Sequence, residues 1–594
     1  MNSEPDRAHR TVTAIACCAL LTLCLCANFT SASQNDDERE SPMLEQAVVI
    51  GPVAQGGRRP FRADAIEAQR IADQWDGAQA GDTLTLPDGA ERTWKQVSAS
   101  NNGWIKHKAL RGGYARFTVQ REQDGVMILH ASGHSAVRVN GRPHYGDPYR
   151  HGYSRIPIAL KQGDNDLLMA CRRGQVRSRL IEPASDVMFN KDDVTVPDAI
   201  VGESGRTLYG SIVIMNTTHQ SQQNLALIAD CGNQSTAETE IKQLAPLSVR
   251  KVRFRMKPTY DRTAQTIDVR LQLKQNRHKL PADDTPSTMQ ATDKDARDRS
   301  ATDKITHTLA NTTLSLRVRE PRQTHKRTFI SNIDRSVQTY SVTPRDTSAN
   351  KEDSKPLGLV LTLHGAGVDA NGQARAYDSK SWCHVVAPTN RRCFGFDWED
   401  WGRLDALEAL EHATARYNHD PQHVYLTGHS MGGHGTWHMG VTFPDRFAAI
   451  GPSAGWISFQ SYTNAASYKN ASRIEKIFHR AGSPSNTLAM KDNLNQHGIY
   501  ILHGSDDQSV PVQEARRMRR VLGTFHRDFA YHEQPGAKHW WGSRCIDWPE
   551  MFDFFKRRSI PHSPDVNHVE FVTASPGVSS TCHWLAINAQ HILF

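Results

Sequence analysis

The sequence lacks the short motifs that identify several classes of metal and redox protein. Its 10 cysteines include no Cys-x-x-Cys pair, which argues against a zinc ribbon and a thioredoxin-like site. No His-Glu-x-x-His pattern occurs either, so we expect His434 and His438 to be core or surface histidines rather than metal ligands. We predict neither a metal nor a cofactor.

Concentrated charge is also missing. The chain carries 71 Lys and Arg against 63 Asp and Glu, and the net charge of +8 is spread along 594 residues rather than gathered in a basic block. No RNA- or DNA-binding motif accompanies it. We therefore expect no nucleic acid partner, and a substrate that is a small molecule, a group linked to a polysaccharide, or a peptide.

Long apolar runs are scarce, and the clearest one lies at the N-terminus. Arg7 and Arg10 precede an apolar run over residues 11–27 that is short for a membrane span, and small residues follow at 31–33. This pattern predicts a signal peptide over residues 1–33, export to the periplasm or the extracellular space, and no membrane span after cleavage. The alternative is an uncleaved N-terminal anchor.

Six cysteines remain after residue 33. An even number in an oxidising compartment permits disulfides, and we expect Cys383 and Cys393 to be the first pair to test. The alternative is that all six are small buried hydrophobic residues, namely Cys171, Cys231, Cys383, Cys393, Cys545 and Cys582. Both interpretations stay open.

The length predicts several domains, and the N-terminal half indicates two β-sandwiches. Over residues 44–185, short alternating runs such as 115–119, 126–130 and 136–139 are separated by turn residues, including the hairpin signal Asn140-Gly141. Over residues 190–322, runs at 212–214, 226–228, 252–254 and 314–318 are typical of an immunoglobulin-like sandwich. A polar stretch at about 279–306 is predicted to be a disordered loop within it.

Over residues 327–560 the pattern of apolar and polar residues changes. Buried strand-like runs at 359–363, 424–426, 448–451 and 499–502 alternate with helical patterns at 404–417, 512–522 and 548–557. This alternation predicts a mostly parallel sheet with helices on both faces, whose functional loops lie at the carboxyl ends of the strands. Residues 561–594 are expected to form a β-rich extension.

The candidate nucleophile lies in Gly428-His-Ser430-Met-Gly432. A strand-like run precedes this segment and a helical pattern follows it, which is the strand-turn-helix context that the G-x-S-x-G motif requires. A serine nucleophile needs a base and an orienting carboxylate, in the chain order Ser, Asp, His for this fold. Asp506 and Asp507 follow a buried strand, and His539 follows the next one.

Together, Gly-His-Ser-Met-Gly-Gly, His503-Gly-x-x-Asp507-x-x-Val-Pro and Gly536-x-x-His539 resemble the prolyl-oligopeptidase-type α/β-hydrolase domain and related secreted feruloyl and acetyl-xylan esterases. The resemblance covers roughly residues 327–558 and implies that Asp507, rather than Asp506, is the acid and that His539 is the base. The sequence departs from prolyl oligopeptidases proper in having two sandwich-like modules where they have a β-propeller. The first module resembles galactose-binding-like jelly rolls, because Val-Asn-Gly is followed by Leu-x-x-Gly-x-Asn between strands.

Further site residues are expected around the triad. An oxyanion hole should combine the backbone N–H of Met431 with that of Ala366, or of Gly365 as the fallback, in the loop Leu363-His-Gly-Ala-Gly367. An aromatic wall for a sugar or phenolic ring is one interpretation of four tryptophans, and core packing is the other. They are Trp398, Trp401, Trp456 and Trp540.

Three functions remain open at this stage. The first is an exported serine hydrolase that cleaves an ester, such as an acyl decoration on a plant or algal polysaccharide. The second is a serine peptidase of the prolyl-oligopeptidase type, and the third is a carbohydrate-binding protein with an inactive hydrolase domain. A complete triad in the expected order argues against the third. No Glu-Glu anchor for a peptide terminus is apparent, which favours the ester.

Overall fold

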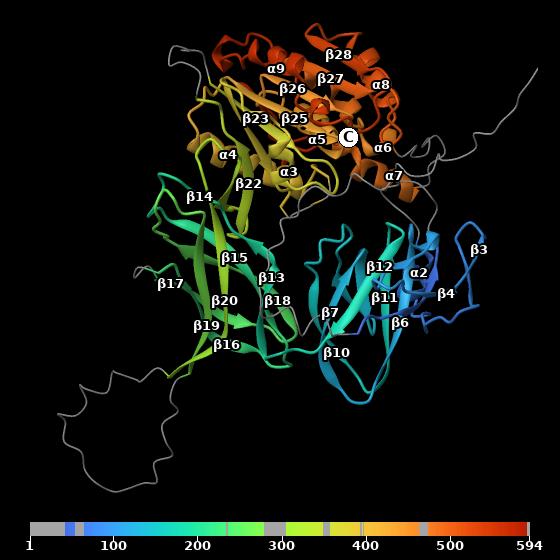
Figure 1. Cartoon of the computed structure of the whole chain (residues 1–594). Coiled ribbons are helices and arrows are strands. Elements are labelled where there is room, and N and C mark those ends of the chain that lie inside the picture. The colour runs from blue at the N-terminus through green and yellow to red at the C-terminus, as the bar shows by residue number, and fades with distance from the viewer. Residues whose placement is uncertain are drawn as a thin grey trace, which may run out of the picture. The chain divides into compact units, whose positions relative to one another are not determined.

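The computed structural model describes residues 42–53, 64–232, 236–277, 305–347, 357–391, 395, 397–462 and 473–590. The predicted signal peptide, Cys393 and the predicted loop up to residue 304 lie outside these ranges. Within them the chain forms two β-sandwiches and an α/β domain in succession, which confirms the predicted multidomain architecture (Figure 1).

The first sandwich consists of a six-stranded sheet, in the order β4-β1-β6-β11-β8-β9, and a four-stranded sheet, β10-β7-β12-β5. One buried cluster takes side chains from both sheets, including Phe117, Leu129, Leu167 and Val176, so alternate residues of each strand share a common core. The strands are β1 Gln46–Ile50, β4 Lys95–Ser98, β5 Ile105–Lys106, β6 Gly113–Arg121, β7 Gly125–Ser132, β8 His134–Val139, β9 Arg142–Tyr145, β10 Arg155–Leu160, β11 Gly163–Cys171 and β12 Gln175–Ile181.

The predicted hairpin at Asn140-Gly141 connects β8 and β9. Val139 pairs with Arg142, and both intervening residues have positive φ, +46° for Asn140 and +86° for Gly141. Positive φ at both central positions defines the type I′ turn that this dipeptide favours. Outside the two sheets, this region also contains α2 Ala65–Ile71 and the short pair β2 Thr83–Thr85 and β3 Glu91–Thr93.

The second sandwich pairs a three-stranded sheet, β13-β15-β18, with a five-stranded sheet, β14-β20-β19-β16-β17. Its strands are β13 Val187–Thr195, β14 Ala199–Ile200, β15 Leu208–Asn216, β16 Gln222–Asp230, β17 Thr236–Leu244, β18 Ser248–Met256, β19 Thr266–Arg277 and β20 Ile305–Arg319. Since β20 begins at Ile305, the last two residues assigned to the predicted loop belong to a strand instead.

The α/β domain contains an eight-stranded sheet in the order β21-β22-β24-β23-β25-β26-β27-β28. The first two strands run antiparallel to their neighbours, and all pairs from β24 to β28 are parallel. The strands are β21 His325–Ile330, β22 Val337–Thr343, β23 Gly358–Leu363, β24 Cys383–Pro388, β25 Val424–His429, β26 Ala449–Ser453, β27 Gly498–Gly504 and β28 Phe529–Gln534.

Helices cover both faces of this sheet. Successive residues of a strand point to opposite faces, so each strand contributes side chains to the packing on both sides. In β23, Leu359, Leu361 and Leu363 pack into one buried cluster and Val360 packs into another. The first cluster includes side chains of α4 Trp401–Arg416, α5 Met431–Thr442 and α8 Gln513–Leu522, and the second includes those of α9 Pro549–Lys556. The other α-helices described in this domain are α3 Ala370–Arg375, α6 Phe459–Tyr462 and α7 Arg473–Ala481.

The C-terminal extension differs from its expectation. Between residues 561 and 590 the only strands described are the two-residue pair β29 Thr581–Cys582 and β30 Leu585–Ala586, and most of the segment is irregular. Some backbone groups of this segment form hydrogen bonds with side chains rather than with a neighbouring strand. For example, the N–H of Val572 donates to Asn493 Oδ1 at 2.8 Å. No helix within the described ranges is long and apolar enough to cross a membrane.

Candidate active site

Ser430 occupies a strained turn between β25 and α5. Its backbone has φ +59° and ψ −116°, an unfavourable region for a residue with a side chain. The flanking glycines are required by close packing: a Cβ at Gly428 would lie 2.4 Å from the carbonyl oxygen of Gly432, and a Cβ at Gly432 would lie 1.9 Å from that of Leu363. The tight turn at the end of β25 thus explains the spacing of the motif.

The structure brings Ser430, His539 and Asp507 into one hydrogen-bonded chain. His539 Nε2 lies 2.8 Å from Ser430 Oγ, and His539 Nδ1 lies 2.7 Å from Asp507 Oδ2. Asp507 follows β27 and His539 follows β28, so neighbouring parallel strands deliver the acid and the base to the same edge of the sheet.

Asp507 is buried and held by four donors. Besides His539, its carboxylate accepts from the N–H groups of Ser509 at 2.8 Å and Val510 at 3.0 Å, and His503 Nε2 lies 3.2 Å away. Burial alone would raise the pKa of Asp507, but the bonds from His503, His539 and Val510 outweigh it and hold the pKa far below its usual range. The group is therefore an ionised, fixed acceptor for the imidazole.

The neighbouring Asp506 lies in a different environment. It is exposed, and its Oδ1 accepts from the hydroxyl of Ser505 at 2.7 Å. The structure thus separates the two adjacent acids in the way that the family resemblance implies: Asp507 contacts the imidazole, whereas Asp506 faces solvent.

The loop after β23 runs beside the nucleophile. A Cβ on Gly365 would lie 3.5 Å from Ser430 Cβ, and Ala366 next to it is exposed. Met431, the other expected oxyanion donor, is buried as the first residue of α5, where the helix N-terminus favours negative charge. The backbone around Ser430 therefore has the small residues and the helix orientation that an oxyanion hole needs.

Trp398 supports this loop from the core. Its ring is fully buried and its Nε1 donates to the carbonyl of His364 at 3.1 Å, while His364 Nε2 lies 3.3 Å from the carbonyl of Thr389. The expectation of a substrate-facing Trp398 is therefore wrong, and the core alternative holds, because the indole fills the space beneath Gly435, where an added Cβ would lie 2.6 Å from Trp398.

The other three tryptophans divide between core and surface. Trp456 is buried, with its ring 4.8 Å from that of His434 and 4.7 Å from that of Tyr462, so it is also a core residue and not part of a wall. Trp401 and Trp540 are about half exposed, at 56% and 53%. Trp540 follows His539 directly and meets the ring of His429 edge-on at 5.4 Å, which places it next to the triad.

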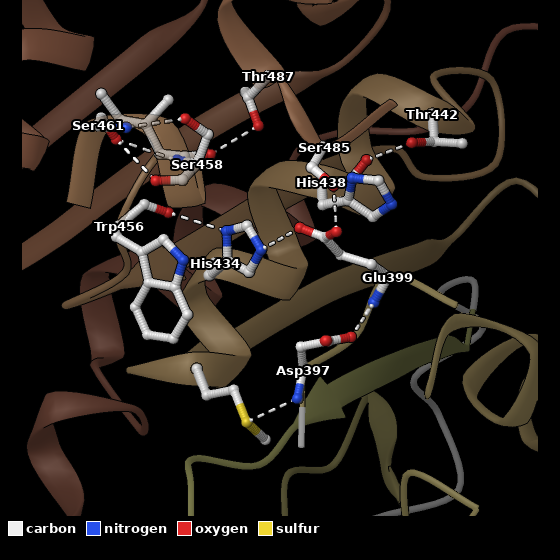
Figure 2. A network of polar contacts seen from close by, with 12 residues as sticks. Asp397, Glu399, His434, His438, Thr442, Trp456, Ser458, Ser461, Ser485 and Thr487 are labelled. Carbon is white, nitrogen blue, oxygen red and sulfur yellow. Dashed lines mark hydrogen bonds and ion pairs between the residues drawn. The ribbon is translucent and has the colours of Figure 1, made fainter. Parts of the chain in front are cut away.

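A buried polar network beside the nucleophile helix was not anticipated from the sequence (Figure 2). Glu399, before α4, lies 2.9 Å from His434 Nε2 on α5 and accepts a hydrogen bond from the hydroxyl of Ser485. His434 Nδ1 lies 3.3 Å from the carbonyl of Trp456. The imidazole therefore links the carboxylate of Glu399 to the backbone carbonyl of Trp456.

The two carboxyl groups of this network have pKa values that are shifted in opposite directions. Burial would raise the pKa of Glu399, but the hydrogen bond from His434 and the neighbouring histidines lower it to about 2. Burial raises the pKa of Asp397, which lies two residues earlier, to about 6. Glu399 and His434 are 35 residues apart, so no local spacing could have revealed the pair.

The structure also places His438 and five of the six cysteines considered in the sequence. His438 is buried with no hydrogen-bond partner for either ring nitrogen among the described residues, and burial lowers its pKa to about 4. Cys383 and four other cysteines are buried free thiols, and the proposed partner Cys393 lies outside the described residues. No group of three or more side chains suited to a metal ion occurs in the part of the chain that the structure describes.

Comparison with known proteins matches part of the chain to one family. Residues 391–559 match the prolyl oligopeptidase family. The C-terminal part of the chain therefore contains a domain of this family. The match covers Ser430, Asp507 and His539 and ends close to α9.

Curated proteins similar to the chain include a depolymerase, an acetylxylan esterase/xylanase and an uncharacterized secreted protein. The chain is 32% identical over 223 residues to poly(3-hydroxyalkanoate) depolymerase C of Paucimonas lemoignei, an alignment covering 32% of this chain and 49% of that protein. It is 28% identical to a bifunctional acetylxylan esterase/xylanase of Neocallimastix patriciarum over 26% of this chain and 22% of that protein. An uncharacterized secreted protein of Arthroderma benhamiae is 29% identical over 36% of this chain and 24% of its own length. The chain thus spans half or less of these relatives.

Solved structures with similarity to the chain include an S-formylglutathione hydrolase from Staphylococcus aureus and a ferulic acid esterase from Anaeromyces mucronatus. The first is 18% identical with a TM-score of 0.30, and the match covers 40% of this chain and 96% of that one. The second is 15% identical with a TM-score of 0.29, and the match covers 40% of this chain and 90% of that one.

Proposed function

We propose that this protein is an exported serine hydrolase that cleaves a carboxylic ester through Ser430, His539 and Asp507. The observation that carries the proposal is the continuous hydrogen-bonded chain from Ser430 Oγ through the imidazole to the buried carboxylate, at 2.8 and 2.7 Å. In this geometry His539 Nε2 takes the proton from Ser430 as Oγ attacks the ester carbonyl, and Asp507 stabilises the resulting imidazolium.

Collapse of the tetrahedral intermediate breaks the ester C–O bond, and the departing alcohol takes the proton from His539, which leaves the acyl group on Ser430. Water then attacks this acyl-enzyme, giving a proton to His539, and the acid product departs as Ser430 Oγ takes that proton back. The negative charge on the tetrahedral carbonyl oxygen is stabilised by the N–H of Met431 and by an N–H from Ala366 or Gly365. Loss of one such donor typically reduces turnover by about two to three powers of ten. Trp540, half exposed beside His539, supplies an apolar surface for the acyl or alcohol part of the substrate.

Ester cleavage is favoured over peptide cleavage by the names of the relatives, since a poly(3-hydroxyalkanoate) depolymerase and an acetylxylan esterase both act on ester bonds. The substrate we favour is an acyl group on a plant or algal polysaccharide. The family match itself supports the second candidate, a serine peptidase of the prolyl oligopeptidase type. Export is supported by the N-terminal pattern of Arg7, Arg10 and the apolar run after them, and by similarity to a secreted protein.

A parallel substrate screen tests the proposal. The chain from residue 34 onward is assayed on p-nitrophenyl acetate, acetylated xylan, methyl ferulate and proline-containing peptide amides, with Ser430→Ala as the matched control. We expect turnover of esters that disappears in Ser430→Ala while the variant keeps the wild-type circular dichroism spectrum.

Three outcomes would contradict the proposal in different ways. Peptide release that depends on Ser430, with negligible ester turnover, would establish the peptidase. Ester turnover that is unchanged in Ser430→Ala would show that the serine is not the nucleophile. No turnover on any substrate would favour a carbohydrate-binding protein with an inactive domain.

A further inference from the structure

The proposed base lies on an irregular segment of the chain. Residues 537–541, which contain His539, form neither helix nor strand. The start of this segment is held against the end of β27, because the N–H of Asp506 donates to the carbonyl of Ala537 at 2.9 Å. The ring of a histidine follows the main chain that carries it. A base that must stay 2.8 Å from its nucleophile therefore needs its main chain to be fixed as well.

One side chain fixes the main chain of His539, and it belongs to the residue before the nucleophile. His429 Nε2 lies 2.8 Å from the carbonyl oxygen of His539. A carbonyl oxygen only accepts, so Nε2 carries the proton and donates it. Among the residues that the structure describes, no other hydrogen bond reaches the main chain of residues 538–540. This bond is therefore the tether of the central part of the segment.

His429 is itself held by the sheet. It is the last residue of β25 and pairs with Ser453 of the parallel strand β26. Its ring is buried, and the ring centre lies 4.8 Å from that of His539 and, edge-on, 5.4 Å from that of Trp540. The donor thus comes from the strand that also presents Ser430. A single rigid strand fixes both the nucleophile and the main chain of the base.

The imidazole of His429 is neutral. Burial, and then the neighbouring charge of His539, lower the pKa of His429 to about 3. A neutral ring donates from Nε2 without adding positive charge beside the imidazolium that forms on His539 during the reaction. A lysine or arginine could also donate to this carbonyl, but its charge would oppose that imidazolium.

We propose that His429 is a positioning residue for the reaction: by holding the carbonyl of His539 against β25, it keeps the imidazole within reach of Ser430. The inference rests on the proposed roles of Ser430 and His539, and it does not depend on whether an ester or an amide bond is cleaved. A misplacement of about 1 Å costs about 10²-fold in rate, so loss of this bond should lower kcat with little effect on KM.

Two substitutions separate the hydrogen bond of His429 from its packing. His429→Leu fills the space without a donor, whereas His429→Gln keeps an N–H donor on a side chain of similar reach. For p-nitrophenyl acetate we expect kcat to fall by about 10- to 100-fold in His429→Leu, with KM within about threefold, and to stay within about fivefold of the parent chain in His429→Gln. A residue that only fills space would give the opposite order, because leucine suits a buried site better than glutamine.

His497→Leu is the matched control. His497 is a buried histidine that lies just before β27, at the other end of that strand from Asp507, and its Nδ1 lies 3.1 Å from the carbonyl oxygen of Pro444. The substitution again removes a ring that contacts a backbone carbonyl, but far along the strand from the triad. It should lower the melting temperature about as much as His429→Leu and leave kcat within about twofold of the parent chain.

Labelling with phenylmethylsulfonyl fluoride, followed by mass spectrometry of the intact chain, provides a second readout that needs no substrate. Ser430 Oγ attacks the sulfur, fluoride departs and His539 takes the serine proton, so the labelling rate should fall in parallel with kcat. If His429→Leu does not fold by circular dichroism, His429→Asn replaces it, because its shorter amide does not reach the carbonyl of His539.

Slow labelling of the donor-free variant, with no ester turnover in the parent chain, would support the positioning role and reject the ester substrate. The positioning role is overturned if His429→Leu keeps kcat and the labelling rate within about threefold of the parent chain. It is also overturned if His429→Gln loses as much as His429→Leu, if His497→Leu is slowed equally, or if the parent chain is not labelled.

Discussion

Replacement of Asp507 by Asn tests the geometry of the triad most directly. In the native chain one carboxylate accepts from the imidazole at 2.7 Å and from the N–H groups of Ser509 and Val510 at 2.8 and 3.0 Å. Asn offers one oxygen and one NH₂ group to these donors. If the oxygen faces the backbone, the NH₂ group faces His539 Nδ1, and the imidazole must turn to the tautomer with a proton on Nε2.

That tautomer cannot take the proton from Ser430, so we expect kcat to fall by about 10⁴, or about 5 kcal/mol of transition-state stabilisation. If the amide flips instead, its NH₂ group faces two backbone donors, each of which then lacks an acceptor at a cost of about 1–3 kcal/mol. Both orientations are unfavourable.

The assay is the initial rate of p-nitrophenyl acetate hydrolysis, with thermal unfolding measured on the same samples. Asp506→Asn is the matched control: it makes the same chemical change on an exposed neighbour whose Oδ1 accepts only from Ser505 among the bonds described for it, and it should cost less than about tenfold. The reasoning fails if Asp506→Asn is the more damaging change, or if Asp507→Asn retains more than about a tenth of the wild-type rate.

Three further predictions concern the core around the nucleophile. Glu399→Gln should lower the free energy of unfolding by about 1–3 kcal/mol, because it removes the carboxylate that lies 2.9 Å from the buried His434 imidazole, whereas Asp400→Asn on the exposed neighbour should change it by less than about 1 kcal/mol. Equal losses of free energy in a urea titration would refute this role of the Glu399–His434 contact. His438→Leu should raise the melting temperature more at pH 5 than at pH 8. The pKa of His438 is about 4 in the folded chain and about 6.5 in the unfolded chain, so between these values only the unfolded chain binds the proton. The stability of the native protein therefore falls as pH drops through this window, and the variant lacks this loss. A gain independent of pH would contradict this. Gly432→Ala should abolish soluble, active protein, because its Cβ would lie 1.9 Å from the carbonyl oxygen of Leu363. Wild-type yield and activity of this variant would show that the turn between β25 and α5 is less tightly packed than this distance requires.

Local sequence was sufficient to predict most of the strands and helices and much of the candidate site. The G-x-S-x-G segment, the acid after β27 and the histidine after β28 are recognisable because each depends on a short stretch with its own strand and turn, and parallel strands bring such stretches to one edge. The hairpin at Asn140-Gly141 was predictable for the same reason, since two adjacent positive φ angles are a property of the dipeptide itself. The β-rich character expected of the C-terminal extension was wrong, because short apolar runs pack equally well as irregular chain.

Tertiary structure decided everything that depends on side chains far apart in the chain. Composition and position could not tell whether Trp398 lines a pocket or fills the core, because burial is set by the neighbouring loop of His364 and by the helix residue Gly435. The contact of Glu399 with His434 likewise arises where the segment before α4 meets α5. The sequence alone determined which groups have the chemistry, through local backbone preferences and motif spacing. Packing alone determined which of them are desolvated, paired or left facing water, since these properties depend on contacts that no local pattern encodes.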